Sequence, residues 1–264
     1  MKCNFIDSFH HLNSRPLLTL NMIKKGIFFI YLLCLGMGNL SAMETPHLLY
    51  DRILFDDFDA YATEIYKALD DKELNYSAFE TGLKGYIKLQ SERQIAENSY
   101  LTVIDMSLSA NANRFFLIDI RNKKIIHKSI VAHGRNSGGE YARSFSNQVG
   151  SFKSSIGFYR TGETYQGKHG LSLRLDGLEY SNSNARKRAI VIHAADYVSE
   201  VFIKNNGRLG RSLGCPSLPE KNYDKVVDKI KNGSLLFIYY PEDAYLNHSE
   251  LANFKSMPFK NQAS

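Results

Sequence analysis

The chain has 264 residues, of which 44% are hydrophobic and 23% charged, a balance typical of a globular protein with one fairly large domain. Its formal net charge of +6 includes Lys2, Arg15, Lys24 and Lys25, and no basic run interleaved with aromatic residues appears. The composition therefore argues against a nucleic-acid partner. It fits a mixed charged surface or a weakly basic protein that acts on an acidic polymer.

Residues 22–42 have the order of a secretory signal. Met22 is followed by Lys24 and Lys25, then by the apolar stretch 26–35, then by a segment rich in small residues up to Ala42. The apolar stretch is shorter than the roughly 20 residues that span a bilayer. We therefore expect residues 1–42 to be a signal segment with its true start at Met22. Its removal predicts an exported protein of the periplasm or cell envelope without a stable membrane anchor.

Two amphipathic helices are predicted in the helical N-terminal region, residues 43–97. Apolar side chains recur at helical spacing in 57–69 and again in 77–90. Ser77 and Glu80 have the spacing of a capping box at the start of the second helix. We expect both helices to pack against the main body and to carry no chemistry.

The pattern changes to short β-type runs in the main body, residues 98–245. The predicted strands are 101–106, 114–120, 125–132, 152–159, 189–193 and 234–240. A hairpin turn is predicted at 121–124, and a helix at 223–230 that Gly233 ends. Residues 246–264 form a C-terminal tail. The sequence thus predicts a mainly β domain with an α-helical N-terminal extension.

The three cysteines are Cys3, Cys34 and Cys215, and Cys215 alone remains once the signal segment is removed. A lone cysteine cannot form an internal disulfide. It is therefore buried and inert, paired with another molecule, or reactive.

A glycine- and arginine-rich loop joins His193, at the end of a predicted strand, to Cys215. A nearby imidazole gives a cysteine the thiolate character that a nucleophile needs. The glycines allow the backbone N–H groups of Gly214 and Cys215 to face an oxyanion. Arg208 and Arg211 are candidates for a bidentate grip on a substrate carboxylate. This pattern favours nucleophilic acyl transfer, with Cys215 as nucleophile and His193 as base.

The sequence His193...Ser212-Leu213-Gly214-Cys215 resembles the catalytic signature of L,D-transpeptidases. Other segments resemble a branch of that group, the murein L,D-transpeptidase catalytic domain family. These segments are 131–138 (VAHGRNSG), 159–165 (YRTGETY), 167–170 (GKHG), 173–177 (LRLDG), 207–216 (GRLGRSLGCP) and the closing strand after Gly233. The resemblance extends over about residues 101–240.

The resemblance implies a β-sandwich or barrel catalytic domain, a thioester on Cys215 and peptidoglycan stem peptides as substrate. It implies neither a metal nor an organic cofactor, and we expect a monomer. The candidate substrate-binding residues are Arg211, Arg208, Ser212, His169, Tyr165, Arg174 and His133. Three positions depart from the familiar signature: Leu213 replaces a histidine, Ser217 replaces an arginine, and Ala194 replaces a glycine.

Other functions stay open at this point. The same site with water as acceptor is an L,D-carboxypeptidase, an inert Cys215 leaves a non-catalytic wall-binding protein, and a cysteine peptidase would cleave all-L peptides. A zinc site could combine His127, His133 and His169 with His193 and Cys215. No close pair among them has ligand spacing, so the sequence does not favour a metal.

Overall fold

The computed structural model describes residues 58–254. The expected signal segment and the proposed start at Met22 lie outside this range. Within residues 58–254, no helix is long and apolar enough to cross a membrane.

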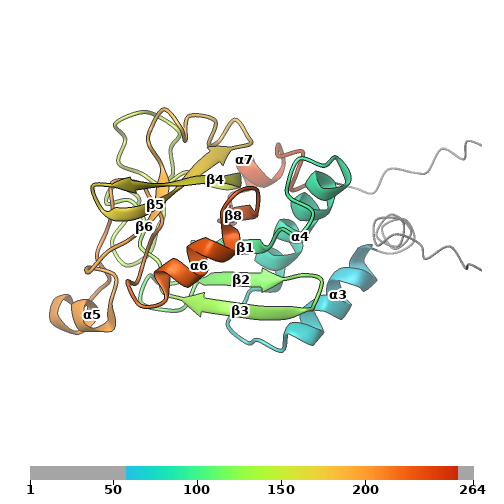
Figure 1. Cartoon of the computed structure of the whole chain (residues 1–264), viewed down its shortest axis with the longest axis horizontal. Helices are drawn as coiled ribbons and strands as arrows, with labels where there is room; N and C mark the ends of the chain where they lie inside the picture. Colours follow the sequence, from blue (N-terminus) through green and yellow to red (C-terminus); the bar gives the residue numbers. More distant parts are fainter. Residues whose placement is uncertain (1–57, 255–264) are drawn as a thin grey trace, which may run out of the picture. The chain divides into compact units, whose positions relative to one another are not determined.

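A single eight-stranded sheet organises the chain (Figure 1). Its strand order is β3-β2-β1-β8-β4-β5-β6-β7. The strands are β1 (Leu101–Asp105), β2 (Phe115–Asp119), β3 (Lys124–Ser129), β4 (Gly157–Gly167), β5 (Gly170–Gly177), β6 (Val191–Ala194), β7 (Ser217–Leu218) and β8 (Leu235–Tyr239). The prediction of a mainly β fold is confirmed.

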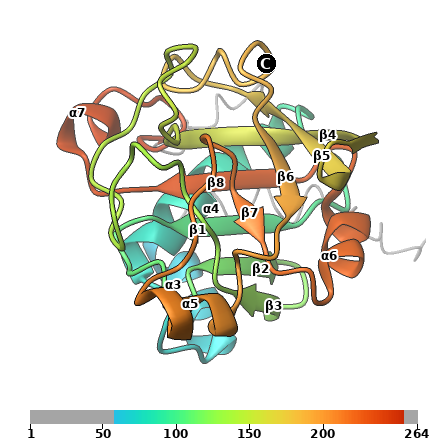
Figure 2. The same ribbon diagram turned by 90° about the vertical axis from the view of Figure 1, so that its left-hand side faces the viewer.

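The sheet curls over on itself. Figure 2 shows β6 and β7 running across β1 and β8, while α4 lies behind those strands. Strands β1 and β8 pair in parallel, as do β6 and β7, and the other neighbours are antiparallel. Strands β1 and β8 are buried along their whole length, as expected for a central parallel pair covered on both faces. The result is the nearly closed, barrel-like sheet expected from the resemblance.

Helices α3 (Phe58–Leu69) and α4 (Tyr76–Ser91) share one hydrophobic core with the sheet. Both agree with the predicted helices to within one residue at each end. The predicted cap is wrong, because the N-cap is Asn75, whose side-chain oxygen accepts hydrogen bonds from the backbone N–H groups of Ser77 and Ala78. Asparagine and serine are about equally favoured as N-cap residues, so residue type alone could not decide between Asn75 and Ser77.

Helix α4 approaches the sheet closely because it presents glycine to it. A Cβ atom on Gly85 would overlap the ring of Phe158, which itself stacks on Phe237 at 4.1 Å between centroids. Gly85→Ala should therefore lower the free energy of unfolding by about 1–3 kcal/mol, because the Phe158 ring that must give way is fully buried and stacked on Phe237. Urea unfolding of the two proteins tests this. Gly139→Ala is the control, because a Cβ atom there meets nothing within 4 Å.

The largest difference from the predicted elements is the β4–β5 hairpin. We predicted a strand at 152–159 and none at 170–177, whereas β4 begins at Gly157 and continues to Gly167, paired with β5. Alternation along this hairpin is irregular, because the register shifts between Thr161 and Thr164. That bulge breaks the period-2 pattern on which the prediction rested.

Three helices complete the described chain. Helix α6 (Tyr223–Ile230) has the predicted bounds, although its C-cap is Lys231 and Gly233 follows two residues later. Helix α5 (Glu200–Asn206) was not predicted, since none of its residues is buried and its apolar periodicity is weak. The short α7 (Asp243–Leu246) was also not predicted. Figure 1 shows α5 standing out from the body at the end bearing β6.

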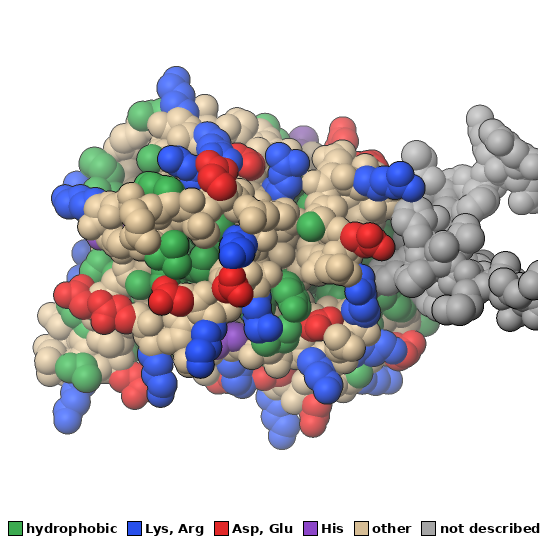
Figure 3. Space-filling model, viewed as in Figure 1, with side chains coloured by type: hydrophobic (Ala, Val, Ile, Leu, Met, Phe, Trp, Pro, Cys, Tyr) green, Lys and Arg blue, Asp and Glu red, His purple; other side chains and the backbone are tan. Residues whose placement is uncertain are grey.

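The surface carries both signs of charge. On the face shown in Figure 3, Lys and Arg side chains lie among Asp and Glu side chains, with no field of a single sign. This agrees with the mixed surface expected from the composition.

Candidate active site

Strand pairing brings His193 and Ser217 side by side. His193 on β6 pairs with Ser172 on β5 and, on its other side, with Ser217 on β7. Directly paired residues point to the same face of a sheet. Cys215 lies two residues before Ser217, next to the start of β6. The fold therefore assembles the two predicted catalytic residues at one edge of the sheet, although 22 positions separate them in sequence.

The His193 ring is held by both of its nitrogens. Nδ1 lies 2.9 Å from the carbonyl oxygen of Ala194, and Nε2 lies 2.9 Å from Ser217 Oγ. A carbonyl oxygen can accept only, so Nδ1 carries the proton of the neutral ring and Nε2 is the basic atom. Alanine serves as well as glycine here, because only the backbone carbonyl is used. The departure at Ala194 thus leaves the orientation of the imidazole intact.

The environment of His193 keeps its ring neutral. Its side chain is almost fully buried, and this burial lowers its pKa. The hydrogen bond with Ala194 acts in the opposite direction, and His169 lowers the pKa further. The ring of His169, at the tip of the β4–β5 hairpin, stacks on that of His193 at 4.5 Å between centroids and 20° between planes. A neutral imidazole is the form a general base needs.

Cys215 is a half-buried free thiol. Its Sγ donates a long hydrogen bond of 3.7 Å to the carbonyl oxygen of Ala189. Burial raises the pKa of the thiol, while the backbone N–H of Val191 and the guanidinium of Arg188 act to lower it. The resting group is therefore a neutral thiol and not the thiolate that the sequence led us to expect. No hydrogen bond joins Sγ to His193 within the described chain.

The turn before Cys215 is shaped by Ser212. Its hydroxyl donates to the carbonyl oxygen of Cys215 at 2.6 Å and accepts from the N–H of Gly214 at 3.1 Å. Gly214 has φ +129°, a conformation that favours glycine. The Gly214 N–H, a predicted oxyanion donor, is thus engaged at rest. The N–H of Cys215 has no hydrogen-bond acceptor among residues 58–254.

Arg188 is the cation beside Cys215, and sequence reasoning did not select it. Its guanidinium is half-buried, and Nη2 lies 3.2 Å from the point that a Cβ atom on Gly214 would occupy. It donates hydrogen bonds to the carbonyl oxygens of Ser146 and Lys153, at 2.7 and 2.5 Å, and to the hydroxyls of Ser155 and Ser151. All these partners are neutral, so its positive charge remains uncompensated and acts on the thiol.

Replacing Arg188 should change the reactivity of the thiol. In Arg188→Gln we expect a higher pKa of Cys215 and an alkylation rate by iodoacetamide about tenfold lower at neutral pH, because a nearby cation favours the thiolate. Arg186→Gln is the matched control, since Arg186 pairs with Glu163 and Asp176 and makes no hydrogen bond or ion pair with Cys215. Equal alkylation rates in the two variants would contradict this role for Arg188.

The side chains of Arg208, Arg211 and His133 contact other groups of the protein at rest. Arg211 donates to the carbonyl oxygens of Arg135 and Gly138, at 3.0 and 2.9 Å, and Arg208 donates to that of Leu209. His133 is fully buried, and its Nδ1 lies 2.8 Å from Nη2 of the buried Arg114. Burial and Arg114 lower the pKa of His133 to about 4. None of these three side chains forms a hydrogen bond with His193 or Cys215.

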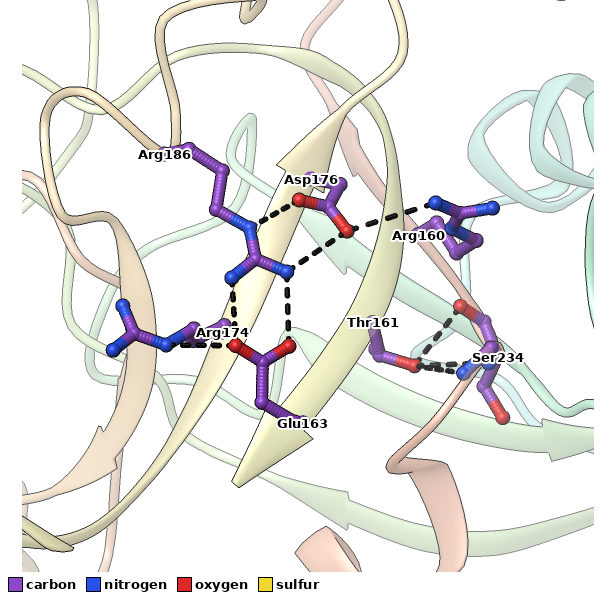
Figure 4. Close-up of polar contacts among 8 residues, drawn as sticks. Arg160, Thr161, Glu163, Arg174, Asp176, Arg186 and Ser234 are labelled. Atoms are coloured by element: carbon purple, nitrogen blue, oxygen red, sulfur yellow. Dashed lines mark hydrogen bonds and ion pairs between the residues drawn. The ribbon is translucent and has the colours of Figure 1, made fainter. Parts of the chain in front are cut away.

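Tyr165 and Arg174 lie on the sheet face that carries His193. Tyr165 on β4 pairs with Ser172, the partner of His193, and Arg174 on β5 pairs with Val191. The guanidinium of Arg174 stacks over the Tyr165 ring at 4.2 Å. Figure 4 shows a row of ion pairs in which Glu163 lies between Arg174 and Arg186. Asp176 pairs with Arg186 in turn, and its other partner is Arg160. Arg174 keeps about a third of its side chain exposed, so it is available to a ligand.

The potential zinc ligands named above do not form a cluster. His127 lies on β3, at the opposite end of the strand order from β7, with its ring against Phe115. Among residues 58–254, no three His, Cys, Asp or Glu side chains are grouped as metal ligands.

Three residues at the site were missed from the sequence: Arg188, Tyr197 and Ser217. The Tyr197 hydroxyl lies 3.1 Å from Ser217 Oγ, which in turn contacts His193. Ser217 was noted only as a departure from a signature. Neither periodicity nor spacing marks any of the three, because each gains its role through a contact made by the curled sheet.

Comparison with known proteins places the chain in a family. The model of the L,D-transpeptidase catalytic domain matches residues 70–239. No curated protein matches the chain. Similar solved structures include an L,D-transpeptidase from Mycobacterium smegmatis, at 13% identity over 54% of this chain and 59% of that one, with a TM-score of 0.34.

Two further structures have the same low similarity. An L,D-transpeptidase solved in complex with imipenem has 14% identity over 53% of this chain and 59% of that one, with a TM-score of 0.34. One from Stackebrandtia nassauensis has 12% identity over 68% and 76%, also with a TM-score of 0.34. The chain thus spans 59% of the length of the first two structures. The family match covers more than half of the chain, and on this ground the chain belongs to the L,D-transpeptidase catalytic domain family.

Proposed function

We propose that the chain is a peptidoglycan L,D-transpeptidase that works through a thioester on Cys215, with His193 as its base. The observation that carries this proposal is the pairing of β6 and β7, which sets the basic nitrogen of His193 against the strand that follows Cys215. Family membership supports the reaction class. Peptidoglycan stem peptides are the proposed substrate, and the periplasm or cell envelope the proposed location.

The first half of the reaction forms the acyl-enzyme. The Ser217 hydroxyl hydrogen turns away from Nε2 of His193, and this nitrogen takes the proton from Cys215 as Sγ attacks the carbonyl between the third residue and the terminal D-alanine of a donor tetrapeptide. The resting pair is neutral, so this proton moves during the attack and not before it. The N–H of Cys215 donates to the developing oxyanion, and Arg188 supplies positive potential nearby. The C–N bond then breaks, and His193 returns the proton to the departing D-alanine.

The second half returns the enzyme. An amine of a neighbouring stem peptide attacks the thioester carbonyl and gives a proton to His193. The C–S bond breaks, a new amide forms, and the thiolate recovers its proton from His193. With water in place of the amine, the same steps make an L,D-carboxypeptidase.

Donor binding is proposed at the face formed by β4, β5 and the hairpin tip. Tyr165, Arg174 and His169 contribute an aromatic ring, an exposed guanidinium and an imidazole on the side of His193. Arg174 is well suited to a substrate carboxylate, since its guanidinium is partly exposed and already oriented by Glu163. Arg208, Arg211, Ser212 and His133 shape the loops around Cys215 through the contacts described above.

A defined disaccharide tetrapeptide tests the function. Incubation with the purified protein, followed by mass spectrometry, should give a cross-linked dimer with loss of one D-alanine. A tripeptide product without dimer would identify the carboxypeptidase instead. Binding without any product would favour the non-catalytic wall-binding protein, and cleavage of all-L peptides would indicate a peptidase.

A further inference from the structure

A chain of two hydroxyl groups ends on the proposed base. Tyr197 Oη lies 3.1 Å from Ser217 Oγ, and Ser217 Oγ lies 2.9 Å from His193 Nε2. Ser217 is fully buried and His193 is 3% exposed, so water does not compete freely for either contact. Ser217 stands where related signatures have an arginine, a residue that cannot accept a hydrogen bond.

The hydrogen-bond contact at His193 Nδ1 determines which group donates at each step of this hydroxyl chain. His193 Nδ1 faces the carbonyl of Ala194, which can accept only, so Nδ1 bears the proton and Nε2 accepts. Ser217 must therefore donate its hydroxyl hydrogen to Nε2. Its oxygen is then open to the hydroxyl hydrogen of Tyr197. Tyr197 therefore donates to Ser217, and Ser217 donates to His193.

We propose that Tyr197 and Ser217 are positioning residues that hold His193 with Nε2 as its basic nitrogen, next to the segment that carries Cys215. The inference rests on the proposed function of His193. Ser217 is the first residue of β7 and lies two residues after Cys215, so the contact ties the base to the segment that carries the nucleophile. A donor on Nε2 also stabilises the neutral ring and lowers its pKa.

Several other groups act on the ring or the thiol. The His169 ring stacks on His193 from the hairpin tip, and Arg188 faces Cys215 from the segment before β6. On the helix side, the Tyr223 hydroxyl donates to the carbonyl oxygens of Leu171 and Ile192, at 2.9 Å each. Tyr223 therefore supports the backbone beside His193 without contacting its ring.

Titration of His193 by NMR, in the full chain and without substrate, separates positioning from general stability. In Ser217→Ala we expect a higher pKa of His193 than in the wild type, because the donor to the neutral ring is gone. In Tyr197→Phe we expect a smaller shift in the same direction, because Ser217 remains but loses the hydrogen bond that orients it. Tyr223→Phe, which loses the hydrogen bonds to the carbonyl oxygens of Leu171 and Ile192 but no contact with the His193 ring, should leave this pKa unchanged.

The kinetic counterpart uses the same variants. Ser217→Ala should lower kcat about tenfold with little change in KM, the cost of one hydrogen bond to the base. The acidic limb of its pH–rate profile should move to higher pH. An unchanged His193 pKa in both Ser217→Ala and Tyr197→Phe, or faster turnover in Ser217→Ala, would overturn the proposal. If Ser217→Ala does not fold, Tyr197→Phe decides the question, since Tyr197 is half-buried and phenylalanine keeps its ring.

The NMR titration also distinguishes a failure of the hydroxyl chain from a failure of the proposed enzyme function. A shifted His193 pKa in the variants of a protein without transpeptidase activity would support the hydroxyl chain and contradict the proposed enzyme function. An active wild type with unshifted variants would reject the hydroxyl chain and retain the enzyme.

Discussion

Cys215→Ala is expected to abolish acylation of the protein altogether. Among the cysteines, Cys215 alone lies in the described chain, and its thiol is half-buried next to an uncompensated guanidinium. Imipenem is the probe, because its strained β-lactam carbonyl is an acyl donor for a nucleophilic thiol. Attack of Sγ on the β-lactam carbonyl opens the ring and leaves the whole inhibitor on sulfur. Intact mass should therefore rise by one inhibitor in the wild type and not at all in Cys215→Ala.

The alanine variant should remain folded, since it replaces one small side chain by another of similar size and leaves the Ser212 turn intact. Transpeptidation should fall by about 10³-fold or more, because no other nucleophile is proposed at the site. An adduct that persists in Cys215→Ala would show acylation elsewhere. A wild type inert to both imipenem and iodoacetamide would leave the wall-binding protein as the better reading.

His193→Ala is expected to slow acyl transfer by about 10²-fold or more at neutral pH. Burial raises the pKa of Cys215, so the thiol is neutral at rest and its attack depends on a base that takes the proton. Removing the imidazole removes that base. The measurement is the rate of adduct formation with imipenem, followed across pH by intact mass.

The pH dependence gives this prediction its sign. Burial and His169 lower the pKa of His193, so in the wild type the base becomes active below the usual histidine range and stays active at neutral pH. In His193→Ala the reaction should instead accelerate as pH rises toward the raised pKa of Cys215. His248→Ala is the control, since His248 is exposed near the C-terminal end of the described chain and contacts the Ala244 carbonyl. A folded His193→Ala protein with wild-type rates would remove His193 from the mechanism.

Several features of the fold were predictable from sequence because local forces determine them. Helix α6 has a regular apolar face made of Tyr223, Val226, Val227 and Ile230, and its predicted bounds are correct. The central strands β1 and β8 are continuous buried runs, and both were found. Where local signals conflicted, prediction failed: the bulge in β4 hid the hairpin, and two residue types suited to capping stood two positions apart in Asn75 and Ser77.

The lone cysteine and the upstream histidine could be selected from sequence, because residue chemistry and the family signature both mark them. The candidate carboxylate ligands were harder. The chain has many arginines, and Arg208 and Arg211 stood out merely by lying near Cys215. Nearness in sequence did not predict their contacts, since Arg211 donates to the backbone carbonyls of Arg135 and Gly138 in the distant loop that follows β3. Arg188, five residues before His193, is the arginine whose charge acts on the thiol.

By itself, then, the sequence determined the composition of the site: a cysteine after a glycine-rich turn, a histidine at a strand end, and a β-rich body to hold them. The tertiary structure alone decided how they are arranged. The parallel pairing of β6 with β7 set Ser217 on the basic nitrogen of His193, and the β4–β5 hairpin brought His169 over the same ring. The physical reason is that strand register and sheet curvature depend on packing across the whole core, and no local segment of the sequence encodes them.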